Sequence, residues 1–285
     1  TAEGMGAGKR EYARKASGQA VLAVLVVGIL FTILTVGLSS KVPVWMQVDP
    51  SIQKLASSYF LILYAPMLFR TANIIFGTVL RAVGDTKTPM QVGIAFNVIN
   101  IVLNFFLIYS TRSVMIGGKG WGVQGAAAAS AIAYTIGGIA ITYKLWKHTE
   151  ISPKGQSLRP DLAVLCPCLK VAVPNMFQRF ATSLGYVVFA SMINSLGETA
   201  TAAHTIANTV ESAFYIPGYG MQTAAATLAG NALGANDNKK LNSLARAIIP
   251  LEVGLMIISG SLLFIFAPVL IKLFSSRMKA PLSFF

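Results

Sequence analysis

Long apolar runs separated by short polar segments dominate this chain. Each run is about 20 residues or longer, the length that a helix needs to cross a hydrocarbon core of roughly 30 Å. Seven such runs occupy residues 20–38, 59–80, 89–110, 123–146, 171–196, 201–230 and 248–273. The pattern predicts an all-α fold, a polytopic membrane helix bundle with about seven spans. Because proline removes a backbone donor, we expect kinks or bends near Pro66, Pro174, Pro217 and Pro250.

A segment of small residues followed by basic residues occurs twice. The first copy, residues 2–14, precedes the first apolar run, and the second copy, residues 230–246, precedes the last one. The two copies are 228 positions apart. An even number of runs lies between them, so both copies face the same side of the membrane. The repeat predicts two parallel-repeat lobes with a ligand site between them.

The longest polar stretch between runs, residues 148–161, contains two prolines and a glycine and indicates a linker. We expect a partial first lobe of four membrane helices at 1–147, an inter-lobe linker at 148–169, and a partial second lobe of three membrane helices at 170–285. Residues 162–169 are expected to lie along the membrane surface. Since Thr1 is not a natural start and the last repeat unit is only begun, we expect an internal fragment of a longer protein.

Charge sets the expected orientation. Only 12% of the residues are charged, against roughly 25% in soluble domains. Fourteen Lys and Arg residues fall in segments on one predicted side and seven on the other. The side with more Lys and Arg is expected to be cytoplasmic. Residues 1–18 and the linker are therefore expected on the cytoplasmic side of a plasma membrane. The basic residues are spread over separate loops, so the net charge of +13 predicts contact with anionic lipid rather than nucleic acid.

Three amides share one face of the run at 89–110. Asn97, Asn100 and Asn104 lie three and four residues apart, and buried in lipid each would cost a few kcal/mol. Ser130 follows small residues in the next run, which allow close helix approach and would bring its hydroxyl to the amides. Amide and hydroxyl oxygens are suitable cation ligands. The alternative is that the amides only join two helices by hydrogen bonds.

Four charges lie inside or near apolar runs, where charges are functional by default. Arg179 is expected to pair with Glu211 or Glu252; the alternative makes Glu211 a proton acceptor. Arg70 either lines a cavity or extends to the interface. His204 is expected to be a hydrogen-bonded structural histidine. Cys166 and Cys168 are expected to be free thiols, and no metal site is predicted.

Known enzyme motifs do not fit this sequence. The glycines at positions 4, 6 and 8 are not a phosphate-binding loop, because Glu3 and Arg10 stand at key positions of that motif. No zinc-protease or serine-hydrolase signature is present. The chain is therefore not expected to be an enzyme.

Several segments together resemble the MATE (multidrug and toxic compound extrusion) transporters. They are LRAVGDTKTPM at 80–90, the amides of the third run, GVQGAA at 122–127, AAHTIA at 202–207, IPGYG at 216–220, and residues 224–234. The resemblance implies a two-lobed exporter of twelve helices, driven by inward flow of Na⁺ or H⁺. The runs present here would correspond to family helices three to nine.

The resemblance also implies roles for particular residues. In prokaryotic members an Asp on the first helix, an Asn and an Asp on the fifth, and a Thr on the sixth form the coupling site. Asn100 and Ser130 fall at the Asn and Thr positions, while Asn104 replaces the fifth-helix Asp. One subgroup uses a Glu on helix seven, where this chain has Thr182.

We therefore expect a secondary antiporter that exports drugs or amphipathic organic cations in exchange for Na⁺ or H⁺. It would need no cofactor besides the coupling ion and would be monomeric when intact. Asn97 and Arg70 are candidates for the cavity lining. One alternative is a flippase of related fold for lipid-linked oligosaccharide or lipid II. Another is a seven-helix receptor, although receptors place the N-terminus outside.

Overall fold

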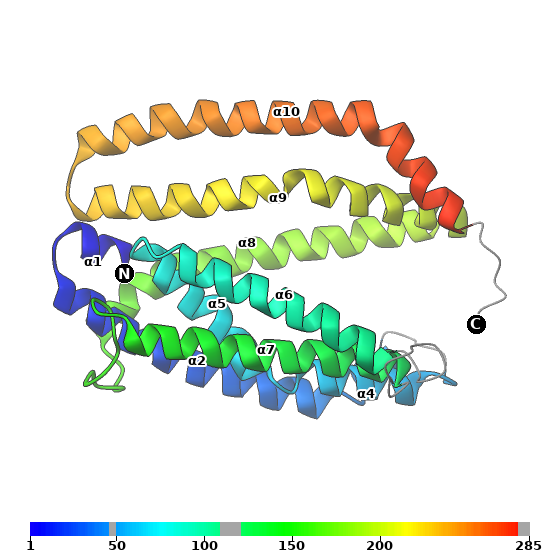
Figure 1. Ribbon diagram of the computed structural model, residues 1–285, viewed down its shortest axis with the longest axis horizontal. Coiled ribbons are helices and arrows are strands. Elements are labelled where there is room, and N and C mark those ends of the chain that lie inside the picture. Colours follow the sequence, from blue (N-terminus) through cyan, green and yellow to red (C-terminus); the bar gives the residue numbers. More distant parts are fainter. Residues whose placement is uncertain (46–49, 109–120, 279–285) are drawn as a thin grey trace. The chain divides into compact units, whose positions relative to one another are not determined.

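The computed structural model describes residues 1–45, 50–108 and 121–278, and all regular structure in these ranges is helical (Figure 1). The prediction of an all-α fold is confirmed. In chain order the helices are α1 (Ala2–Gly6), α2 (Arg10–Leu38), α3 (Val42–Trp45), α4 (Gln53–Tyr64), α5 (Met67–Ala82), α6 (Lys87–Ile108), α7 (Gly122–Lys147), α8 (Leu162–Asn194), α9 (Glu198–Gly234) and α10 (Asn238–Met278).

The chain forms two compact units, Thr1–Leu165 and Cys166–Phe285. Their boundary falls within the predicted linker at 148–169. The first part of this linker packs on the first unit, where Ile151 is fully buried and Ser152 Oγ donates to the carbonyl oxygen of Trp146 at 2.8 Å. The boundaries predicted for the two lobes remain predictions.

In the first unit, α7 packs against α4, α5 and α6, and α2 packs against α5. Small residues make the close approaches. A Cβ added to Gly138 would overlap the backbone of Phe69 on α5, and one added to Gly28 would overlap Leu68. Such contacts are typical of membrane helix pairs, in which small residues let backbones approach closely. The buried apolar cluster at one end of these helices includes Phe76, Leu80, Ile141 and Leu145.

The helices α4 and α5 form one bent span. They meet at an angle of 42° across a break at Ala65 and Pro66. This bend confirms the prediction for Pro66, because a proline inside a helix removes a hydrogen bond and its ring clashes with the preceding turn. By contrast, α8 runs through Pro174 and α9 through Pro217 without a break.

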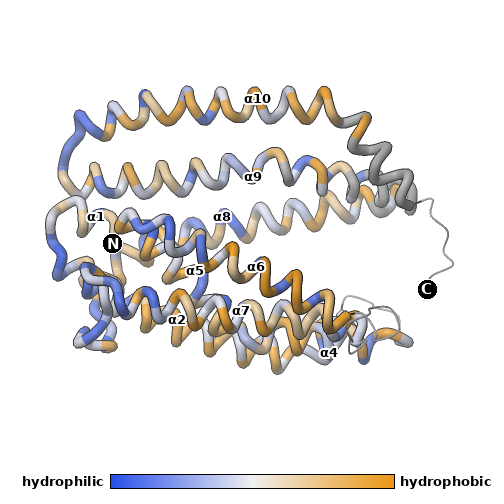
Figure 2. The backbone as a smooth tube through the Cα atoms, viewed as in Figure 1, coloured by the Kyte–Doolittle hydropathy of each residue, from blue (hydrophilic) through white to orange (hydrophobic). Residues whose placement is uncertain are grey.

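Four described helices are long and apolar enough to cross a membrane, namely α2, α6, α7 and α10, and the bent α4–α5 pair makes a fifth. Hydrophobic residues dominate α6 (Figure 2), and only 6% of its apolar window is buried within the protein, as expected of a helix that contacts lipid. In their described residues, α8 and α9 do not meet the same hydropathy criterion. The predicted count of seven spans therefore remains a prediction.

The second unit contains α9 and α10 and most of α8. The helices α9 and α10 pack against each other, and Ser259 Oγ on α10 donates to the carbonyl oxygen of Phe214 on α9. Residues 162–169 form the first turns of α8, and the carboxylate of Asp161 accepts a hydrogen bond from Ala163 N there. Their place along the membrane surface remains a prediction.

Candidate amide cluster and linker contacts

The amide cluster lies where α6 and α7 pack closely. A Cβ on Gly125 of α7 would overlap the carbonyl group of Leu107 on α6, so glycine at this position allows the approach. Asn100 Nδ2 donates to Ser130 Oγ at 3.0 Å across the two helices. One turn further along α6, Asn104 Nδ2 donates to Asn100 Oδ1 at 2.9 Å. The structure therefore brings Asn100, Asn104 and Ser130 together, as the spacing predicted.

One oxygen of this cluster lacks a donor. Within the described residues, Asn104 Oδ1 is buried and accepts no hydrogen bond. Leaving a buried acceptor unsatisfied costs about 1–3 kcal/mol. The other neutral oxygen atoms of the cluster are Asn100 Oδ1 and Ser130 Oγ, each of which accepts one hydrogen bond. These oxygen atoms are therefore suitable ligands for a small hard cation, which prefers oxygen ligands.

Asn97 is separate from this group. Its side chain is exposed, and Nδ2 donates to the carbonyl oxygen of Gly93 one turn back in α6, at 2.9 Å. An amide at the end of the same helical face can satisfy itself on its own backbone in this way. Asn97 thus lies on the predicted face of α6 but is not part of the cluster.

Arg70 of α5 is held by aromatic rings. Its guanidinium carbon lies 4.9 Å from the ring centroid of Tyr134 on α7 and 5.8 Å from that of Tyr64 on α4. The Tyr134 ring also packs on Phe96 of α6, with centroids 4.6 Å apart. Sequence reasoning singled out Arg70 but missed both tyrosines, because their place on helix faces toward Arg70 depends on how three helices pack.

The charged candidates of the second unit are exposed. Arg179 on α8 and Glu211 on α9 both have exposed side chains, and in the described part of the chain no ion pair joins Arg179 to Glu211 or Glu252. Glu252 instead lines a pocket of about 560 Å³ between α9 and α10, together with Tyr215 and Tyr219.

His204 and the cysteines have no described metal-binding neighbours. The His204 ring packs edge-on against Phe189 with centroids 5.4 Å apart. Cys166 and Cys168 are free and exposed. The described residues contain no group of His, Cys, Asp and Glu side chains arranged to hold a metal ion.

The predicted cytoplasmic segments of the first unit meet at one end of its helices. Arg10 Nη2 lies 3.3 Å from Glu150 Oε1, and Arg14 donates to the carbonyl oxygen of Thr149 at 3.2 Å. These contacts join the start of α2 to the segment that follows α7. Residues predicted on the same membrane side are thus neighbours in space.

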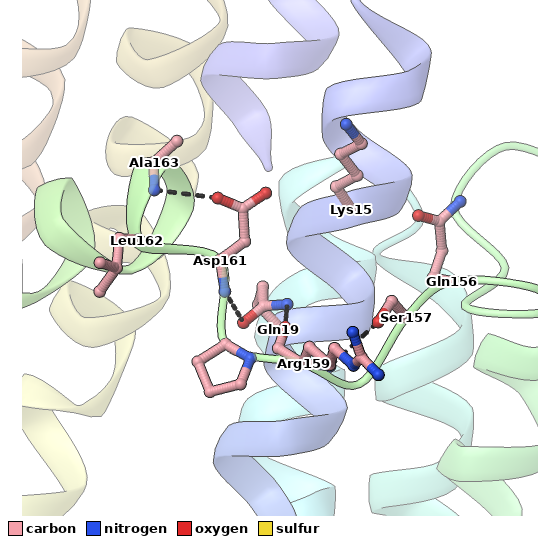
Figure 3. A pocket seen from close by; sticks show the side chains of 9 residues that line it. Lys15, Gln19, Gln156, Ser157, Arg159, Asp161, Leu162 and Ala163 are labelled. Carbon is pink, nitrogen blue, oxygen red and sulfur yellow. Dashed lines mark hydrogen bonds between the residues drawn. The ribbon is translucent and has the colours of Figure 1, made fainter.

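Gln19 anchors the linker to α2 at this end (Figure 3). It is only 5% exposed, its Nε2 donates to the carbonyl oxygen of Arg159 at 2.8 Å, and its Oε1 accepts from Asp161 N at 3.2 Å. These residues and Lys15 line a pocket of about 510 Å³. Sequence reasoning missed Gln19, because bonds to backbone atoms 140 residues away leave no pattern in the sequence.

Asp85 caps the start of α6. Its Oδ1 accepts a hydrogen bond from Thr88 N at 3.0 Å. Partial burial raises the pKa of the Asp85 carboxyl group, but hydrogen bonds from Thr88 and the positive charges of His148 and Lys144 outweigh it and hold this pKa below its usual value. An Asp three residues before a Thr, ahead of an apolar run, is the sequence signal that would have found this cap.

Comparison with known proteins identifies the family. The family model described as MatE matches residues 1–106 and 174–280. The probable multidrug resistance protein NorM of Thermotoga maritima is 27% identical over 96% of this chain and 58% of its own length. The mouse multidrug and toxin extrusion protein 2 is 26% identical over 66% of this chain and 32% of its own length.

Solved structures share the fold. An outward-facing MATE family transporter of the MOP superfamily superposes with a TM-score of 0.86 at 24% identity, covering 96% of this chain and 59% of that one. A MOP superfamily transporter from Pyrococcus furiosus, described as having a binding pocket of reverse polarity, gives 0.87 at 24% identity over 99% and 60%. The chain spans about half the length of the curated relatives it matches. With a family model matched over most of its residues and the fold of solved MATE transporters, this chain belongs to the MatE family.

Proposed function

We propose that the intact protein is a secondary antiporter that exports drug-like organic molecules, amphipathic organic cations among them, in exchange for Na⁺ or H⁺. Family membership, relatives described as multidrug resistance proteins, and a polar cluster inside an apolar helix pair support the proposal. Because this chain spans about half of those relatives, the proposal concerns the whole protein. It would act as a monomer in the plasma membrane, with residues 1–18 and 148–169 in the cytoplasm.

The unpartnered Oδ1 of Asn104 is the observation that carries the proposal. A cation bound there would supply the interaction that this buried oxygen lacks, with Asn100 Oδ1 and Ser130 Oγ as neighbouring ligands. Amides and hydroxyl groups are neutral near physiological pH. The cluster therefore suits Na⁺ better than H⁺, because proton coupling needs a group that can take up the proton.

Coupling to H⁺ has a different candidate. Glu211 on α9 is the acidic side chain that the sequence analysis selected, and its exposed position in the described second unit leaves it open to solvent or to further helices. Its role as a proton acceptor remains a prediction. A protein coupled through Glu211 would respond to a pH gradient and not to Na⁺.

Efflux from proteoliposomes tests the proposal. The intact protein is reconstituted with a fluorescent amphipathic dye inside, and a Na⁺ gradient or a pH gradient is imposed separately. We expect efflux to follow the Na⁺ gradient. Efflux that follows only the pH gradient would indicate coupling through an acidic group such as Glu211 instead of the amide cluster. The absence of gradient-dependent efflux for any dye or drug would refute the antiporter.

A flippase for lipid-linked oligosaccharide or lipid II would need a strongly cationic cavity. In the described parts of the predicted spans, the arginines within the apolar runs are Arg70 and Arg179. This small number disfavours a diphosphate-linked substrate. The relatives reported above are transporters and resistance proteins, so they lend no support to a seven-helix receptor.

A further inference from the structure

Arg70 carries a charge near the middle of the helices without an anionic partner in the described residues. It is partly buried, and the ion pair found in that part of the chain joins Arg10 to Glu150 instead. Its described contacts are the two tyrosine rings, Tyr134 and Tyr64. The face of an aromatic ring attracts a cation. Unlike a carboxylate, however, it has no oxygen atoms to accept hydrogen bonds from the five N–H groups of a guanidinium. These donors are thus available to a ligand.

The depth of Arg70 excludes the lipid headgroups as the source of its anion. Its contact residue Tyr134 lies about midway along α7 (Gly122–Lys147), roughly 18–20 Å from either end at 1.5 Å per residue. Headgroup phosphates lie outside the hydrocarbon core, which is about 30 Å thick. Lipid phosphates are therefore poor partners for Arg70, whereas a transported molecule that enters the lobe can carry an anion to it.

Packed aromatic side chains connect Arg70 to the amide cluster. Tyr134 is one turn from Ser130 on α7, and its contact residue Phe96 is one turn from Asn100 on α6. A substrate that touches Arg70 meets a fixed positive charge, which disfavours a purely cationic molecule at contact distance, since like charges repel. A molecule with both charges avoids the conflict.

We propose that Arg70 binds the carboxylate of an aromatic substrate, so that this transporter prefers amphipathic zwitterions to their purely cationic analogues. The planar guanidinium fork matches a carboxylate with two parallel hydrogen bonds. Tyr64 and Tyr134 beside Arg70 are partly exposed, so the edges of their rings can contact an aromatic substrate. This inference names a substrate class for the transporter proposed above and rests on that proposed function.

A matched pair of ligands tests the preference. One is a xanthene dye with a free carboxylate, and the other is the methyl ester of the same dye, which keeps the cationic ring system. Equilibrium binding of both to the purified intact protein is measured by fluorescence polarisation, and their efflux is measured in proteoliposomes. We expect the carboxylate dye to bind at least about tenfold more tightly than the ester, the factor that one charge-assisted hydrogen bond supplies.

Substitution then assigns the preference to Arg70. Arg70→Gln should reduce the ratio of the two dye affinities to about one. Arg70→Lys should keep part of the preference for the carboxylate dye. Arg246→Gln, the same change on α10, is the control and should leave the ratio unchanged. A ratio near one in the unsubstituted protein, or an unchanged ratio in Arg70→Gln, would overturn the inference. Because binding is measured without a gradient, failure of efflux for both dyes would count against the antiporter and not against the carboxylate site.

Discussion

Gly8 and Asn236, 228 positions apart, occupy the same left-handed position in two turns with the same hydrogen bonds. Their φ angles are 68° and 53°. After α1, Lys9 N donates to Gly4 O at 2.9 Å and Gly8 N to Met5 O at 3.0 Å. After α9, the equivalent donors at positions 237 and 236 reach the carbonyls of residues 232 and 233, both at 3.0 Å. Both turns are Schellman motifs, so the sequence repeat is also a structural repeat at this site.

The two turns differ in the residue that takes the left-handed conformation. Glycine adopts it without a steric cost, whereas an L side chain is strained by roughly 1 kcal/mol. Asn236→Gly should therefore stabilise the intact protein by up to about 1 kcal/mol, and Gly8→Ala should destabilise it by about as much. Apart from Gly8 itself and its two chain neighbours, no described residue has an atom within 4 Å of a Cβ added to Gly8, so the change acts through the backbone.

Thermal unfolding in detergent, followed by circular dichroism, measures both changes. Gly254→Ala is the matched control, because Gly254 lies within α10 and a Cβ there also meets open space. In a regular helix that change should be neutral or stabilising. Equal destabilisation by Gly8→Ala and Gly254→Ala would show that the left-handed position is not the cause.

Removal of either side of the α6–α7 hydrogen bond should weaken coupling. Asn100→Ala and Ser130→Ala each delete a proposed cation ligand, and each lost ligand should raise the Na⁺ concentration for half-maximal efflux by about tenfold. Asn97→Ala is the control from the same helix face, since its amide bonds only to Gly93 O. Small and equal effects of all three changes would leave the amides as structural contacts between helices.

Asn104 offers a gain of function. Asn104→Asp keeps the size of the side chain but places a negative charge beside Asn100 and Ser130. Opposite charge strengthens cation binding, so half-maximal efflux should need about tenfold less Na⁺ above the pKa of the new carboxyl group. Activity of this variant should fall as the pH is lowered, because protonation removes the charge. A variant with unchanged Na⁺ dependence at every pH would argue against a cation at this oxygen.

The sequence predicted the amide cluster because helical spacing is regular. The interval between Asn100 and Asn104 places them one turn apart, and the small residues around Gly125 indicated close contact with α7. Asn97 shows where the same reasoning fails, since helical spacing says which face a residue shares but not which acceptor its amide will choose. The apolar run at 20–38 likewise did not predict that α2 begins at Arg10. The first turns of α2 pack on the linker and are not apolar, so hydropathy does not mark them.

The Asp85 cap predicts a pH dependence. The pKa of this carboxyl group lies below its ordinary value of 3.8 in the folded protein. The contribution of Asp85 to stability is therefore present above pH 3.8 and is lost as the pH falls through the lower, folded value. Asp85→Asn should flatten the acid end of the stability curve while it keeps a capping side chain for Thr88 N. Unfolding in detergent between pH 2.5 and 6 would measure this, and parallel curves for both proteins would contradict it.

The Gln19 anchor predicts a local opening of the linker. Gln19→Leu places an apolar side chain of similar size in this buried position but leaves Arg159 O and Asp161 N without their partner. Each lost bond is worth about 1 kcal/mol, so the open state of residues 153–160 should become roughly 5- to 30-fold more populated. Trypsin reports on this opening, because Lys154 is exposed and Gly155 follows it. Gln91→Leu, the same change at an exposed site on α6, should leave the cleavage rate after Lys154 unchanged. If the two variants are cleaved equally fast, Gln19 does not hold the linker, and the packing of Ile151 and Ser152 holds it on the first unit instead.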